Sequence, residues 1–128
     1  MAGFNNREQF LASEPEMDMT QFRHVEYDLK YADQSENQIL DIIYPDEGEG
    51  PFPLIIVFHG GAFVMGHKRT HYISSMCQPV TQGYAVATVE YRLVQEALWP
   101  AQLIDGKAAI RYLRANAEKL NLDPERFA

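Results

Sequence analysis

The stretch Leu54-Ile55-Ile56-Val57-Phe58-His59-Gly60-Gly61-Ala62-Phe63 decides the fold class of this chain. Residues 54–58 form an unbroken apolar run rich in β-branched side chains, which is typical of a strand buried on both faces of a sheet. At Gly60 and Gly61 the backbone can turn sharply and leave its N–H groups uncovered. Two such groups at a strand end can stabilise an oxyanion. A Gly-Gly pair taken alone also suits a simple tight turn.

Strands and helices alternate on both sides of this stretch. Residues 25–31 alternate between apolar and polar side chains and, with the apolar segment 39–44, predict an antiparallel hairpin. Downstream, residues 72–82 predict a helix that breaks or kinks at Pro79. Residues 84–89 predict a second buried strand.

A further helix is predicted from Pro100 to about Asn121. Its apolar residues recur at helical spacing and predict one buried stripe, made of Leu103, Ile110, Leu113, Ala117 and Leu120. Residues 126–128 then begin another predicted strand. Strands that alternate with helices indicate parallel strands joined by crossover helices, so the predicted fold class is α/β.

Composition and charge bound the organisation and the partners of the chain. With 128 residues, 46% hydrophobic and 23% charged, it suits one globular domain and excludes wholesale disorder. The net charge of −7 and the absence of a Lys/Arg cluster argue against a nucleic-acid partner. No apolar window is long enough for a membrane span, and no apolar leader is present, so a cytoplasmic location is the default expectation.

Metal and nucleophile signals are weak. His67 and His71 are four residues apart but have no third ligand nearby, so we expect ordinary surface residues, no metal and no cofactor. Ser74, Ser75 and the single cysteine, Cys77, lie on a predicted helix without a glycine elbow. We therefore expect these three residues to pack rather than to attack a substrate.

Residues 54–63 resemble the His-Gly-Gly-Gly loop that follows the third strand of α/β-hydrolase esterases and lipases. The resemblance is closest to the hormone-sensitive-lipase-like, acetyl-esterase and feruloyl-esterase group. Four further segments stand in the order that this group shows: Leu40 to Pro45, Val89 to Leu93 with Glu90 in place of an aspartate, Trp99 to Asp105, and Asn121 to Arg126. The resemblance covers residues 25–128. It implies the N-terminal portion of an α/β-hydrolase fold with an incomplete sheet, preceded by an N-terminal extension, residues 1–22, that is a short helix or irregular.

The resemblance implies roles for the loop residues. The N–H groups of Gly60 and Gly61 become oxyanion-hole donors, and Ala62, in place of the family's third glycine, is a further donor if its φ stays negative. His59 is either a general base or an anchor whose ring hydrogen-bonds the nearby backbone. Because the family's catalytic histidine lies near the C-terminus, the anchor is preferred.

Two further pairs of residues follow from position and type. Phe63 and Trp99 are predicted to line an acyl or aromatic pocket, with core packing as the alternative. Arg92 and Asp105 are predicted to form a structural ion pair that ties the loop after residues 84–89 to the last helix.

The rest of the family's machinery is absent from this sequence. It contains no Gly-x-Ser-x-Gly, and the family's Asp/Glu and His lie further along the chain. We therefore expect a truncated piece of a longer serine carboxylesterase, inactive alone. The expected substrate is a small ester, with a formamide left open.

The family's sheet order also predicts a partner. It places the third strand between the fourth and the fifth, so residues 54–58 would form an open edge. The expected partner is the missing C-terminal half or a second copy of the chain. The alternative function is a non-catalytic half-hydrolase module that binds a small acyl ligand or is completed by a partner chain.

Overall fold

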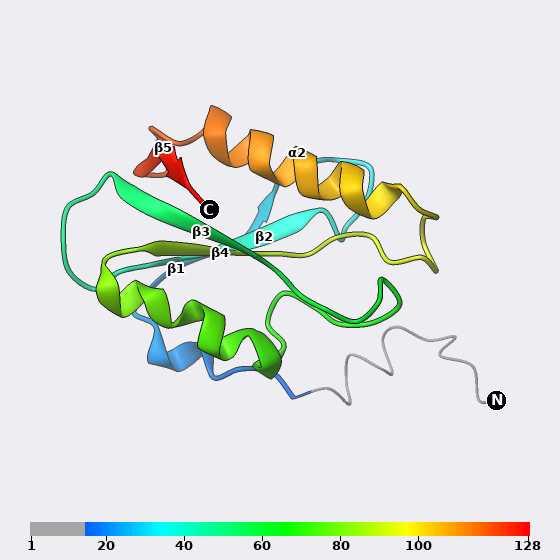
Figure 1. Cartoon of the computed structure of the whole chain (residues 1–128), viewed down its shortest axis with the longest axis horizontal. Helices are drawn as coiled ribbons and strands as arrows, with labels where there is room; N and C mark the ends of the chain where they lie inside the picture. The colour runs from blue at the N-terminus through cyan, green and yellow to red at the C-terminus, as the bar shows by residue number, and fades with distance from the viewer. Residues whose placement is uncertain (1–14) are drawn as a thin grey trace.

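The computed structural model describes residues 15–128 and contains one five-stranded sheet with the strand order β1-β2-β4-β3-β5 (Figure 1). The strands are β1 (His24–Lys30), β2 (Ile39–Tyr44), β3 (Phe52–Phe58), β4 (Ala85–Val89) and β5 (Leu122–Phe127). The predicted hairpin is confirmed, because β1 pairs antiparallel with β2. Most of the predicted N-terminal extension lies outside the described residues. Within it, Met19–Gln21 form a short 3-10 helix, η1.

The central strands bring two loops to one end of the sheet. β3 runs parallel to β4 in a register that pairs Leu54 with Ala85 and Phe58 with Val89. All of β4 is buried, whereas β3 is only partly buried, with Phe58 41% exposed. Because the paired strands end together, the next residues, His59 and Glu90, emerge side by side.

Helical segments cover both faces of the sheet (Figure 1). On one face lies η2 (His71–Gln82), a 3-10 helix that buries Ile73 and Cys77 in a cluster with Val57. The predicted break at Pro79 is wrong, since the helix runs through it. Proline lacks an N–H in either kind of helix, so η2 continues through Pro79 with one hydrogen-bond donor fewer.

On the other face lies α2 (Ala101–Ala115), whose buried side differs from the predicted stripe. Leu113 is buried as predicted, but Leu103 is 47% exposed. Gln102 and Asp105 take the buried positions in the first turns instead. The prediction failed there because both polar side chains find buried hydrogen-bond partners, so they pack inward like apolar ones.

The predicted open edge of β3 is partly closed. The last strand begins at Leu122, earlier than predicted, and pairs parallel with β3, Phe52 opposite Leu122 and Leu54 opposite Phe127. The backbone N–H of Ile56 donates to the carbonyl of Ala128 at 2.7 Å, which is the last pairing along this edge. The strand order with β3 between β4 and β5 agrees with the prediction. Among the described helices, none is long and apolar enough to cross a bilayer.

Candidate active site

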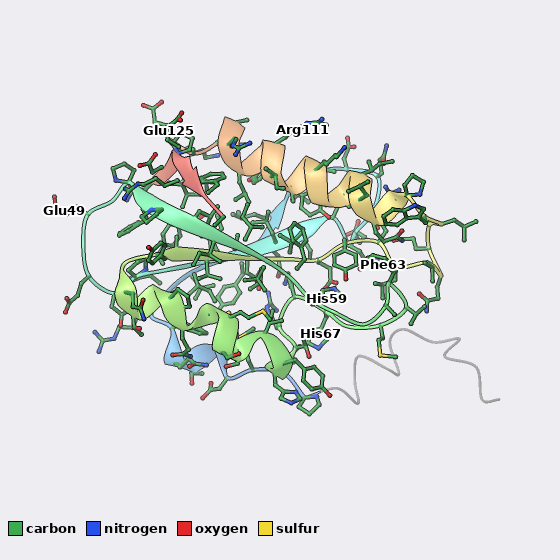
Figure 2. All side chains as sticks on the ribbon, in the orientation of Figure 1. Glu49, His59, Phe63, His67, Arg111 and Glu125 are labelled. Carbon is green, nitrogen blue, oxygen red and sulfur yellow. The ribbon has the colours of Figure 1, made fainter. Side chains whose placement is uncertain are left out.

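The loop that follows β3 folds back on the carbonyl of Gly61. The backbone N–H groups of Val64 and Met65 donate to this oxygen at 3.0 and 3.2 Å. Gly61, Ala62 and Phe63 all have positive φ, of 123°, 54° and 63°. Figure 2 shows His59, Phe63 and His67 together near this loop, far from Glu49 at the other end of the sheet.

Three consecutive N–H groups in this loop have no acceptor within the part of the chain that the structure describes. Among the hydrogen bonds of residues 15–128, none uses the N–H of Gly60, Gly61 or Ala62. Gly60 and Ala62 are exposed, and Gly61 is partly exposed. Successive backbone N–H groups in a turn with left-handed residues form a concavity that binds anions.

The loop requires glycine at position 61 and tolerates alanine at position 62. A Cβ on Gly61 would lie 2.2 Å from the carbonyl oxygen of Met65, and its φ of +123° is itself strained for other residues. The condition of a negative φ at Ala62 is not met, because its φ is +54°. An alanine in this region costs roughly 1–2 kcal/mol, and no hydrogen bond of its N–H is found among residues 15–128.

His59 is buried beneath the loop, and its ring binds the peptide group between Gly60 and Gly61. Its Nδ1 lies 2.8 Å from the carbonyl oxygen of Gly60, which only accepts, so Nδ1 carries the proton. The ring stacks on Tyr91 at 4.4 Å, and the Tyr91 hydroxyl donates to the backbone carbonyl of His59 at 2.6 Å. Because the Gly60 carbonyl and the Gly61 N–H belong to one planar peptide, fixing the first orients the second. This is the geometry that an anchor needs.

A partly buried cluster of charged side chains holds the far end of the loop. The Lys68 Nζ donates to Asp28 at 2.6 Å and lies 3.1 Å from Asp41, while the Arg69 Nε donates to Asp41 at 2.7 Å. The hydrogen bond from Lys68 lowers the pKa of the Asp28 carboxyl. Lys68 and Asp41 are both buried. No local sequence pattern indicates this cluster, because its partners come from segments far apart in the chain.

Arg92 and Asp105 lie in direct contact. Two guanidinium nitrogens of Arg92 reach Asp105 at 2.8 and 3.0 Å, and the Arg92 backbone N–H donates to the same carboxylate at 3.0 Å. The buried Gln38 amide donates to Asp105 at 2.9 Å. Burial alone would raise the pKa of Asp105, but these hydrogen bonds outweigh it and hold the pKa below its usual range.

Phe63 and Trp99 line the same cavity, with ring centroids 5.5 Å apart. This cavity of about 310 Å³, which we name the apolar groove, lies between the end of β3 and α2. Its apolar lining residues are Phe58, Phe63, Tyr91, Trp99, Leu103 and Ile110. Several of them are well exposed, Trp99 at 58% and Phe63 at 42%.

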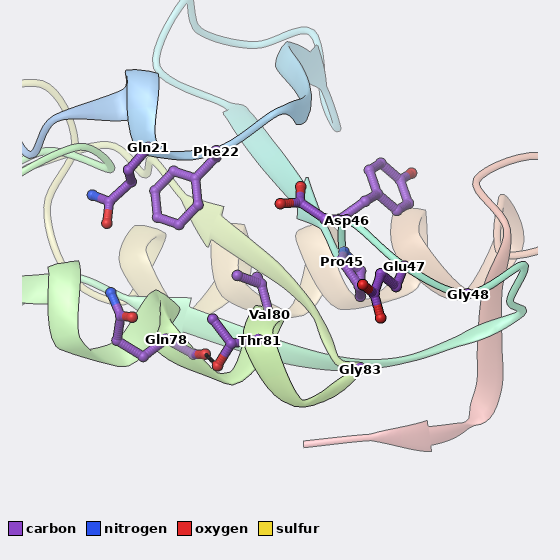
Figure 3. A pocket seen from close by; sticks show the side chains of 11 residues that line it. Gln21, Phe22, Pro45, Asp46, Glu47, Gly48, Gln78, Val80, Thr81 and Gly83 are labelled. Atoms are coloured by element: carbon purple, nitrogen blue, oxygen red, sulfur yellow. Dashed lines mark hydrogen bonds between the residues drawn. The ribbon is translucent and has the colours of Figure 1, made fainter.

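A larger cavity of about 630 Å³ lies at the opposite end of the sheet (Figure 3). Phe22, Val80 and Pro45 supply apolar surface, and Asp46 and Glu47 supply carboxylates. Among the described residues that line it, there is no histidine, serine or cysteine. We therefore place the candidate active site at the loop after β3 and not in the larger cavity.

The remaining candidate nucleophiles and ligands lie away from this loop or are buried. Cys77 is buried in the core, and burial raises the pKa of its thiol to about 11. The prediction that His67 is a surface residue is wrong, because it is 6% exposed and its Nδ1 accepts from the Arg69 N–H. Within residues 15–128, no group of three His, Cys, Asp or Glu side chains is placed to hold a metal ion.

Comparison with solved structures defines the class of this fold. The chain superposes on a structure described as a truncated form of carbohydrate esterase from gut microbiota, with a TM-score of 0.77 and 32% identity. The match covers 89% of this chain and 41% of that one. The fold is therefore the N-terminal part of an α/β-hydrolase. Residues 40–128 match the BD-FAE family, and the chain belongs to this α/β-hydrolase family.

Curated relatives of the chain are esterases. It is 32% identical over 87 residues to carboxylesterase NlhH of Mycobacterium tuberculosis, which covers 68% of this chain and 27% of that protein. It is 36% identical over 84 residues to esterase LipI of the same organism, which covers 66% of this chain and 26% of that protein. The chain thus spans about a quarter of the length of these curated relatives.

Proposed function

We propose that this chain supplies the oxyanion loop of a serine carboxylesterase. The observation that carries the proposal is the run of three N–H groups at the end of β3, at Gly60, Gly61 and Ala62, which have no acceptor among the described residues 15–128. Ester cleavage by acyl transfer passes through a tetrahedral oxyanion, and each donor aimed at it lowers the barrier by about 3 kcal/mol. His59 acts as the anchor of these donors and not as the general base, because its ring is buried and hydrogen-bonded to the loop.

The complete catalytic unit extends beyond this chain in this proposal. Residues 23–128 form the N-terminal half of a hydrolase domain, and a Gly-x-Ser-x-Gly, an acid and a second histidine complete it. The share of the relatives that the chain spans, about a quarter, supports this view. Alone, the chain is inactive.

The apolar groove has two roles in this unit. Exposed Phe58, Leu103 and Ile104 form the face on which the other half of the domain packs, or on which a second copy packs in its absence. Phe63 and Trp99, nearest to the loop, contact the apolar part of a small ester substrate. No cofactor is needed for this chemistry.

A chimaera tests the proposal. Residues 40–128 replace the matching segment of carboxylesterase NlhH, which then supplies the rest of the fold. We expect hydrolysis of p-nitrophenyl acetate, and we expect Gly61→Pro, which removes one N–H donor and also disrupts the turn that needs a positive φ at this position, to lower kcat at least about 100-fold. Gly83→Ala is the control, because Gly83 lies away from the loop and a Cβ there meets nothing within 4 Å. Full activity of the Gly61→Pro chimaera would contradict the proposed donors.

The second candidate function is a module that binds a carboxylate without turning it over. The exposed N–H groups of the loop favour it, since they can hold an anion without a nucleophile. Calorimetric titration of the 128-residue chain with acetate and butyrate separates the two functions. Binding by the chain, together with an inactive chimaera, would support the module over the esterase.

A further inference from the structure

We propose that Glu90 is a positioning residue that closes the oxyanion loop by holding both of its ends with one carboxylate. The significance for catalysis rests on the proposed function, whereas the closure itself is a property of the fold. The loop leaves the sheet at His59 and returns at Lys68. Glu90 is the first residue after β4, and the parallel register places it beside His59.

The two oxygens of Glu90 reach different ends of the loop. Oε1 lies 3.3 Å from the Nε2 of His59, at the start of the loop, and the two groups form an ion pair when the ring carries a proton on Nε2 as well as on Nδ1. Oε2 accepts a hydrogen bond from the backbone N–H of Lys68, also at 3.3 Å. The Glu90 residue is 7% exposed, so water screens these contacts little. One side chain therefore spans the loop between its first and last residues.

Glu90 is itself held firmly. Its backbone N–H donates to the carbonyl of Ile39 in β2 at 2.9 Å, and its carbonyl accepts from the Tyr31 hydroxyl at 2.6 Å. Both contacts connect it to the hairpin and not to the loop. The backbone of Glu90 is thus held in place by the hairpin, and its carboxylate extends from this position to the loop.

The two ends that Glu90 joins are also restrained from the other side. The Nδ1–H of His59 holds the Gly60 carbonyl, and the Lys68 ammonium is bound by Asp28 and Asp41. Between these ends, Gly66 packs so closely over His59 that a Cβ would lie 2.4 Å from Nδ1. Closure by Glu90 therefore sets the position of the His59 ring and, through it, the direction of the Gly61 N–H.

Side-chain length is decisive for this role. An aspartate, the residue of the resembled family, is shorter by one methylene, or about 1.5 Å. From the same backbone position it cannot keep both the ion pair with His59 and the hydrogen bond from Lys68 at their present 3.3 Å. A glutamine has the full reach: its oxygen can accept from Lys68 and its amide can donate to the Nε2 of His59. Comparing Glu90→Asp with Glu90→Gln therefore shows whether the length or the charge of the side chain matters at this position.

Amide hydrogen exchange of the 128-residue chain, followed by NMR, tests this inference. The reporters are the Lys68 N–H, which binds Glu90, and the Val64 and Met65 N–H groups, which bind Gly61 inside the loop. For Glu90→Ala and Glu90→Asp we expect these amides to exchange about tenfold faster relative to the Ala87 amide in β4. Glu90→Gln should restore them to within about threefold of the unmodified chain.

The matched control is Glu96→Ala. The Glu96 carboxylate accepts from Ser35 and Asn37, outside the loop, so its removal should leave the three reporter amides unchanged. Equal protection of the reporters in Glu90→Asp and in the unmodified chain would overturn the inference. So would uniform acceleration of every amide in Glu90→Gln, because a residue that only stabilises the fold would behave in that way.

The same substitutions in the NlhH chimaera test whether Glu90 affects the rate of ester hydrolysis. Glu90→Asp should lower kcat about tenfold with KM nearly unchanged, because the donors act on the transition state rather than on the bound ester. Loop exchange does not require activity. A chimaera without any activity would therefore count against the proposed function, while the exchange data would still decide whether Glu90 closes the loop.

Discussion

Arg92 binds Asp105 through both its guanidinium and its backbone N–H, so a single carboxylate fixes the position and the orientation of the segment that follows β4. Asp105 is fully buried, and the Arg92 side chain is 15% exposed. The pair joins α2 to the segment that carries Glu90 and Tyr91, and therefore to the support of the oxyanion loop.

Asp105→Asn should cost about 3 kcal/mol of unfolding free energy at pH 7, because it leaves the Arg92 charge without its buried partner. The sign of the pH dependence follows from the lowered pKa of Asp105 in the folded chain. The stabilisation is complete above the unfolded value of 3.8 and is lost as the pH falls through the folded value. Urea unfolding at pH 7 and pH 3 should show a smaller difference between the chains at pH 3.

Asp123→Asn is the control for this substitution, because Asp123 pairs with Arg126 at the surface. Its unfolding curve at pH 7 should stay close to that of the unmodified chain. An equal loss of stability in both variants would argue against a special role of the buried pair.

Gly66→Ala should destabilise the chain by about 3 kcal/mol through two effects. Its φ is +96°, and the new Cβ would meet both the His59 ring and the Gly60 carbonyl oxygen, at 2.4 and 2.5 Å. Gly83→Ala isolates the first effect, since φ is +89° and the space around it is open, and should cost about 1 kcal/mol. Urea unfolding measures both variants, and equal losses would show that the loop does not pack tightly on His59.

Leu103→Lys should reduce binding of the dye ANS and shift sedimentation towards the monomer, because it places a charge in the apolar groove. Leu98→Lys is matched in chemistry but lies outside the groove lining, with Leu98 78% exposed. The expected result is a clear change for the first variant and little for the second. The same change in both would mean that general surface hydrophobicity, and not the groove, drives association.

Cys77 should react with iodoacetamide at pH 8 more than 100-fold slower in the folded chain than in urea. Burial raises the pKa of its thiol to about 11, which leaves roughly one molecule in a thousand as thiolate, and the side chain is also covered. Mass spectrometry after timed quenching measures the rate. Rapid labelling without urea would show that η2 does not stay packed on the sheet.

Periodicity and local turn chemistry were sufficient to predict most of the sheet. The position of β3 between β4 and β5 was expected from the resemblance to α/β-hydrolases and not from a local pattern. The hairpin and the apolar strands β3 and β4 agree with expectations from the sequence. These features depend on side-chain patterns that are local in the chain. The glycine pair at residues 60–61 stood out for the same reason.

Features that depend on distant partners were not predictable in this way. Gln102 and Asp105 point inward on α2 only because partners in other segments satisfy them. The position of Glu90 beside His59 follows from the register of β3 and β4, which no local pattern encodes. A single sequence therefore does not reveal the residues that support a functional loop through contacts with distant segments.

Trp99, the only tryptophan of the chain, stands at the rim of the apolar groove with its ring 5.5 Å from that of Phe63. The fluorescence of Trp99 can therefore report on binding at the apolar groove. An ester, a carboxylate or a second protein surface that covers the indole will shift its emission to the blue without any attached label. Stopped-flow fluorescence can then time the arrival of each ligand separately from any chemistry that follows.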